Sequence, residues 1–148
     1  MDGDTDVIRR RMSALRDQGA DVRALADQLV ARVEGLGWAG RAAEAMAARV
    51  TERAVHLRAV ADRHVAAADA LGDHAEAVDA TVEEIAQTQA RVETMVADAR
   101  ARVDRIAEAN RAGATISPDP ADEALLAFEP PPPGHRAWLE VDVPGLER

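Results

Sequence analysis

The chain of 148 residues contains no cysteine, no tyrosine and no lysine, and only 2% of its residues are aromatic. The absence of cysteine excludes disulfide bonds, thiol nucleophiles and cysteine-based metal sites. With so few aromatic rings, any core must be built from the small and medium aliphatic side chains that dominate the sequence. Such side chains suit closely packed helices, so the composition favours an all-α fold.

The sequence also lacks a continuous apolar run. Its first residues, MDGDTDVIRRRM, are acidic where a secretory signal would be basic, so we expect neither a signal peptide nor a transmembrane helix. The formal net charge is −9, and nearly every arginine has an acidic neighbour within one helical turn. Because phosphate contacts need a basic face, we expect no nucleic-acid partner, and we expect no insertion into a membrane.

No familiar catalytic or metal-binding arrangement is present in the sequence. It contains no G-x-S-x-G, no glycine-rich phosphate loop and no pair of histidines four residues apart on a helix. The four histidines are His56, His64, His74 and His135. We therefore predict a protein that is not an enzyme and that uses no metal or cofactor.

Two long amphipathic patterns are present. From Ile8 to Leu36 the apolar residues recur at steps of three, four or seven, which predicts a first helix over roughly residues 5–34. After Gly40, two heptad series contain no carboxylate and no arginine, and we call them together the seam. The first series is Val50, Leu57, His64, Leu71, Val78, Ile85, Val92, Ala99 and Ile106, and the second is Ala47, Ala54, Ala61, Ala68, Ala75, Val82, Gln89, Val96 and Val103.

Gly72 divides the seam and leaves two architectures open. The heptad phase crosses Gly72 without a skip, which favours one continuous or kinked helix over residues 41–111, since a single glycine costs a helix only about 1 kcal/mol. Asp73 and Glu76, however, have the spacing of a capping box, which would start a third antiparallel helix over residues 73–111 and give a three-helix bundle.

The composition of the seam changes along its length. The second series is alanine before residue 76 and mostly valine after it, so we expect the first half to pack closely on the first helix and the second half to meet a different neighbour. His64 is interpreted as a tolerated or register-setting polar residue of the seam, with a pH-sensitive contact as the alternative, and Gln89 as a residue that sets the register. The predicted surface for pairing with itself or with another helical protein is Val78, Val82, Ile85, Val92, Val96, Val103 and Ile106.

Past Gly113 the sequence becomes rich in proline, glycine and acidic residues. We therefore predict two regions, a helical hairpin or coiled-coil domain over residues 1–112 and a proline-rich, largely disordered tail over residues 113–148. The end of the tail alternates apolar and acidic residues with the period of a strand, which has no partner strand in this chain. It either stays disordered or docks through Trp138, Leu139, Val141 and Val143.

Between the two long helices, three glycines surround Trp38 in the stretch GLGWAG. They permit a tight reversal, and we expect the indole to cover the end of the interhelical core. Trp38-Ala39-Gly40, followed by Ala42, Ala43 and Met46, resembles the Trp-x-Gly turn and the start of the second helix in the WXG (ESAT-like) family. The resemblance covers about residues 5–80.

The WXG proteins are helical hairpins exported by the type VII (ESX) secretion system, and the resemblance implies a similar role. It implies a secreted protein without a cleavable signal, a recognition turn made by Gly37, Trp38 and Gly40, and a homodimer or a heterodimer with another hairpin protein that engages the secretion machinery. The family's Tyr-x-x-x-Asp/Glu export signal is absent here, so the protein is expected to travel on a partner that supplies one or to stay in the cytoplasm as an adaptor. The alternative is a cytoplasmic coiled-coil scaffold or dimerisation protein unrelated to secretion.

Overall fold

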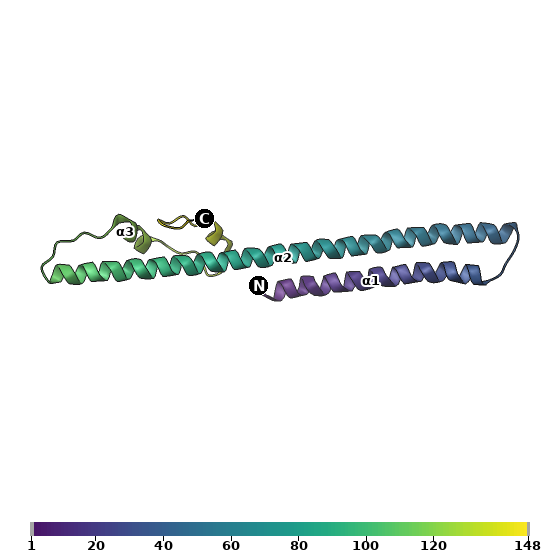
Figure 1. Ribbon diagram of the computed structural model, residues 1–148, viewed down its shortest axis with the longest axis horizontal. Helices are drawn as coiled ribbons and strands as arrows, with labels where there is room; N and C mark the ends of the chain where they lie inside the picture. The colour runs from purple at the N-terminus through teal and green to yellow at the C-terminus, as the bar shows by residue number, and fades with distance from the viewer. Residues whose placement is uncertain (1, 148) are drawn as a thin grey trace. The chain divides into compact units, whose positions relative to one another are not determined.

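A computed structural model describes residues 2–147. Residues 1 and 148, the ends of the two predicted regions, lie outside the described residues. The described chain contains helices and no strand, which confirms the all-α prediction. Its elements are α1 (Asp2–Gly35), α2 (Arg41–Arg111), α3 (Pro120–Ala127) and the 3-10 helix η1 (Arg136–Glu140), as Figure 1 shows. They form two compact units that divide between Asp79 and Ala80, and α2 contributes to both. Within the described residues, no helix has the length and apolar character needed to cross a membrane.

The helix α2 runs through Gly72 as one element of 71 residues, so of the two architectures left open by the sequence the structure has the continuous helix. Gly72 has a packing role instead of ending the helix. A Cβ atom placed on it would lie 3.2 Å from the sulfur of Met12 in α1. Glycine at this position therefore leaves room for a long side chain of the opposite helix.

In the first unit, α1 lies antiparallel to the first part of α2, as Figure 1 shows. Ion pairs between the helices define the register, since residue numbers rise on α1 as they fall on α2. The pairs are Arg16–Asp69 at 2.9 Å, Asp27–Arg58 at 2.6 Å, Arg23–Asp62 and Arg9–Asp79. Their side chains are exposed, so each pair contributes only about 0–1 kcal/mol and the register depends mainly on the core between the helices.

That core is built from very small residues, as the alanine half of the seam predicts. The fully or almost fully buried side chains of the hairpin are 0–3% exposed and comprise Thr5, Ala26, Ala54, Ala61, Ala68 and Ala75. On α1, Gly19 is buried one heptad before Ala26. A Cβ placed on Gly19 would lie 3.2 Å from the carbonyl oxygen of Ala61. The two backbones approach closely because no large side chain separates them.

The second unit differs from the disordered tail that the sequence predicts. Residues 114–147, which we call the C-terminal segment, include α3 and η1 and fold back along the second half of α2. The final residues form a 3-10 helix and a turn in place of the predicted strand. The physical reason is that α1 has 34 residues against the 71 of α2, so it cannot cover the whole apolar seam and the second half needs another cover.

Replacing Ala61 by leucine should destabilise the hairpin, because Ala61 is fully buried and its carbonyl lies against Gly19. The added carbon atoms would have to push α1 and α2 apart. We expect the free energy of unfolding to fall by about 1–3 kcal/mol, measured by urea denaturation of the full chain followed by circular dichroism.

The matched control is Ala59→Leu, which adds the same side chain to the same helix at an exposed position. It should change the free energy of unfolding by less than about 0.5 kcal/mol. Equal effects of the two substitutions would contradict the close approach of the helices at Ala61.

Candidate functional site

The turn between α1 and α2 has the backbone geometry that its glycines predict. Gly37 has φ 61° and Gly40 has φ 100°, both in the left-handed region that residues with a Cβ atom rarely adopt. The carbonyl oxygen of Gly40 then accepts a hydrogen bond from the backbone N–H of Glu44 at 3.0 Å, which opens α2. The reversal is therefore fixed by two glycines on either side of Trp38.

Trp38 itself does not cover the interhelical core, so that part of the prediction is wrong. Its side chain is 66% exposed, and Leu36 and Met46 beside the turn are each about half exposed. The residues of α2 nearest the turn, such as Ala43 and Ala47, are themselves only half-buried. The turn instead presents three large apolar side chains to solvent, which we call the turn residues: Leu36, Trp38 and Met46.

A second candidate surface lies where the C-terminal segment covers α2. Trp138 is 2% exposed and lies in one buried cluster with residues of both elements. The other buried members are Ile85, Val92 and Ala99 of α2 and Leu125, Val141 and Val143 of the C-terminal segment. The ring of Phe128 meets the indole edge-on, with ring centroids 6.3 Å apart. This cluster is the core of the second unit.

Polar contacts fix the position of the C-terminal segment on α2. Gln89 accepts a hydrogen bond from the backbone N–H of Gly134 at 3.2 Å, in a turn where Gly134 has φ 70°. Arg91 donates to the carbonyl oxygen of Glu147 at 3.0 Å, and the indole N–H of Trp138 donates to that of Pro132 at 3.0 Å. Gln89, interpreted from sequence as a register-setting residue, therefore binds the chain's own C-terminal segment.

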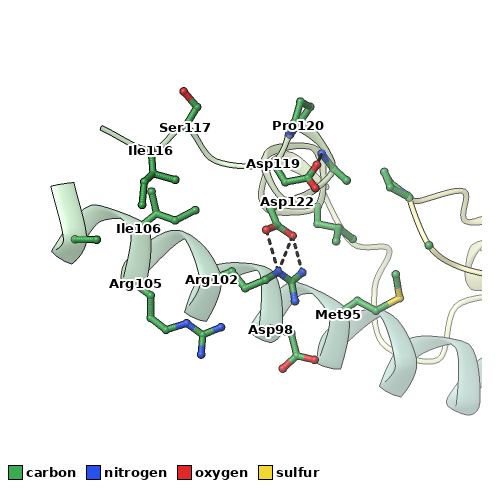
Figure 2. Close-up of a pocket in the computed structure, with 15 residues that line it drawn as sticks. Met95, Asp98, Arg102, Arg105, Ile106, Ile116, Ser117, Asp119, Pro120 and Asp122 are labelled. Atoms are coloured by element: carbon green, nitrogen blue, oxygen red, sulfur yellow. Dashed lines mark hydrogen bonds and ion pairs between the residues drawn. The ribbon is translucent and has the colours of Figure 1, made fainter. Parts of the chain in front are cut away.

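An ion pair joins α3 to α2 (Figure 2). Asp122, which is 5% exposed, accepts hydrogen bonds from Nε of Arg102 at 2.9 and 3.1 Å and from Nη2 at 2.5 Å. The hydrogen bonds from Arg102 lower the pKa of Asp122 below its ordinary value of 3.8, and partial burial opposes this shift. The same hydrogen bonds raise the pKa of Arg102. The negative charges of Asp98 and Asp119 raise this pKa further, at longer range.

The ion pair lies in an open groove of about 1020 Å³ between α2, α3, the loop before α3 and the turn at Pro144 and Gly145. Figure 2 shows Arg102 and Asp122 facing each other across it, with Asp98 and Arg105 directed away from Asp122. Both charges are already paired, and among the described residues no buried side-chain nitrogen or oxygen lacks a hydrogen-bond partner. No group of three or more possible metal ligands occurs among the side chains that the structure describes either.

The predicted pairing surface is not uniformly accessible. Ile85 and Val92 are buried beneath the C-terminal segment, and Val96 packs against the same cluster. The remaining predicted residues are half-buried, and these are Val78, Val82, Val103 and Ile106.

The four residues predicted for tail docking are brought together on α2 of the same chain. Trp138, Val141 and Val143 are buried and Leu139 is partly buried. The heptad pattern of the sequence did not indicate α3. The dipeptide Asp119-Pro120 is the sequence feature that could have indicated the start of α3. In the structure the Asp119 side chain accepts a hydrogen bond from the N–H of Ala121, and Pro120 occupies the first helical position.

Comparisons with protein-family models, with curated proteins and with solved structures found no match. The geometry of the turn residues and of the C-terminal segment is therefore the basis for a functional proposal.

Acid should loosen the C-terminal segment, because Asp122 holds α3 on α2 only while it is ionised. Its pKa is lowered in the folded chain, so its stabilising contribution is present above about pH 3.8 and is lost as the pH falls through the lowered pKa. A Trp38→Phe variant leaves Trp138 as the single tryptophan. We expect its fluorescence emission to move to longer wavelength as the pH falls below about 3.8.

Asp122→Asn in the same background should shift the emission of Trp138 already at neutral pH, because Arg102 loses its charged partner. Asp142→Asn is the control, since it removes a carboxylate of the same segment at an exposed position and should behave like the parent. An Asp122→Asn chain that matches the parent at every pH would show that the ion pair does not hold the segment.

Proposed function

We propose that this protein works by helix association in the context of type VII secretion, as a WXG-like substrate, escort or adaptor. The observation that carries the proposal is the exposed Trp38, presented on a glycine turn between two antiparallel helices. Its support from the sequence is the Trp-x-Gly motif at that same turn. The proposed activity is the binding of another protein and involves no chemical reaction.

An indole that is 66% exposed contributes little to the stability of the hairpin. Large aromatic side chains that lie exposed beside other apolar residues are typical anchors of protein interfaces, where tryptophan is enriched. Leu36 and Met46, also exposed, flank the turn on the side of each helix. The turn residues therefore have the chemistry of a recognition surface for an apolar partner.

The alternative role, a coiled-coil scaffold unrelated to secretion, would use the second half of α2. There the C-terminal segment buries Ile85 and Val92, so a scaffold would first have to uncover them. The turn residues need no such rearrangement, which favours the turn as the first contact with a partner.

The 148 residues contain no tyrosine, which bears on the route of export. In the proposed role, the chain either leaves the cell bound to a hairpin protein that carries the tyrosine signal or remains in the cytoplasm as an adaptor for such a protein. Both versions require a partner that recognises the turn.

Trp38→Ala should abolish export while leaving the fold intact, because the exposed indole is a recognition group and not part of the core. The measurement compares cell and culture-filtrate fractions in a strain with and without the secretion ATPase, and tests co-purification of partners from the cell fraction. The free energy of unfolding should change by less than about 0.5 kcal/mol.

The matched control is Val55→Ala, which truncates another exposed apolar side chain of the same hairpin away from the turn. It should be exported like the wild type. Retention of every sample in the cell, with or without the ATPase, would exclude the export version, and partner binding that survives Trp38→Ala would exclude the turn as the recognition surface.

A further inference from the structure

The second half of α2 carries a heptad seam that is more regular than its present cover requires. The seam residues of this half are Val82, Ile85, Gln89, Val92, Val96, Ala99, Val103 and Ile106. They span more than three heptads on one helix, which is sufficient for a coiled-coil interface. The C-terminal segment that covers them contains one helix of 8 residues and a 3-10 helix of 5 residues. An irregular cover does not need a heptad pattern, whereas a second long helix does.

The seam is complementary to itself when two copies run antiparallel. With a two-fold axis near residue 94, the facing pairs are Val82 with Ile106, Ile85 with Val103, Gln89 with Ala99 and Val92 with Val96, each formed twice. Gln89, the one polar residue, meets alanine, the smallest seam residue of this half. The remaining pairs join β-branched residues of similar size, so the layers fill evenly.

Charges beside the seam select the same register. In this register Glu93 of each copy lies across from Arg100 of the other copy, which gives two opposite-charge pairs. A shift of one heptad in either direction would place Arg100 against Arg100 or Glu93 against Glu93. A parallel arrangement would place Glu93 across from Thr88 and Arg100 across from Met95, without a charge pair.

We infer that the C-terminal segment and the α2 helix of a second copy of this chain compete for the seam over residues 82–106. In the closed form the segment covers the seam through Trp138, Val141 and Val143 and is held by Gln89 and Arg102. In the open form two α2 helices pair antiparallel across it. The inference rests on the helix-association part of the proposed function, but it involves neither Trp38 nor export, so the two can fail separately.

Releasing the segment should therefore produce a dimer. The full-length chain with Trp138→Asp places a carboxylate in the buried cluster, and analytical ultracentrifugation should show dimers at concentrations where the wild type is monomeric. The control, Val55→Asp, places a carboxylate at an exposed apolar position outside the seam and the turn and should stay monomeric. Val143→Asp is a second release variant, and circular dichroism checks that helix content is retained in each. Release variants that keep their helices and remain monomeric would overturn the inference.

A cross-linking measurement does not depend on the release variants. The chain has no cysteine, so a single introduced thiol can form a disulfide only with its counterpart in another copy. The proposed two-fold axis brings position 95 close to position 95 of the other copy, and it places position 88 against position 102. Under mild oxidation Met95→Cys should cross-link, faster still with Trp138→Asp, and Thr88→Cys should not. Failure of Met95→Cys to cross-link in either background would overturn the inference.

The charge pairs test the direction and register. In the Trp138→Asp background, Glu93→Arg or Arg100→Glu alone creates two like-charge pairs and should raise the dimer Kd by roughly tenfold. The double variant restores opposite charges with their positions exchanged and should recover the original Kd. Single variants that dimerise as well as their parent would exclude the antiparallel pairing.

Discussion

The structure depends on one constraint, which is that α2 carries a single apolar seam through most of its 71 residues and must keep that seam out of water. A single helix cannot bury its own apolar face, because its backbone hydrogen bonds run along its axis and bring no second element against that face. The remaining elements of the chain supply that cover. α1 covers the first half with an alanine interface, and the C-terminal segment covers the second half with a cluster around Trp138.

The two covers differ in how they are specified. Between α1 and α2 the contact is made by the smallest side chains, and the exposed ion pairs only reinforce a register set by close backbone approach. On the second half, the fit depends on a few directional contacts, with Gln89 bound to the Gly134 backbone and Arg102 bound to Asp122. The first mode follows from heptad periodicity, whereas the second depends on single residues that are far apart in sequence.

This difference decides how much could be predicted from the sequence. The helices, the glycine turn and the close packing of the first half follow from local pattern, because periodicity and positive φ are properties of short stretches. The docking of Trp138 could not be derived in the same way, because its partners are brought near only by the reversal after Arg111 and by the turn at Gly134. Trp38 shows the opposite case, since its motif is recognisable from a short stretch but the motif does not reveal that the indole is 66% exposed in the folded turn. Composition also misled, since proline at residues 130–133 indicated disorder, while in the folded chain Pro132 accepts a hydrogen bond from the indole of Trp138.

The alanine core of the hairpin has a thermodynamic consequence. Each buried alanine removes little apolar surface from water, so the first unit gains less from the hydrophobic effect than a hairpin of similar length with leucine at the same positions. Its unfolding should also show a small heat-capacity change, because that quantity scales with the apolar area exposed. Anything that binds only the native hairpin adds a stabilising free energy set by its concentration and its Kd, and this addition weighs more where burial itself contributes little. The fraction of the hairpin that is folded at a given temperature should therefore rise with the concentration of any molecule that binds only the folded hairpin.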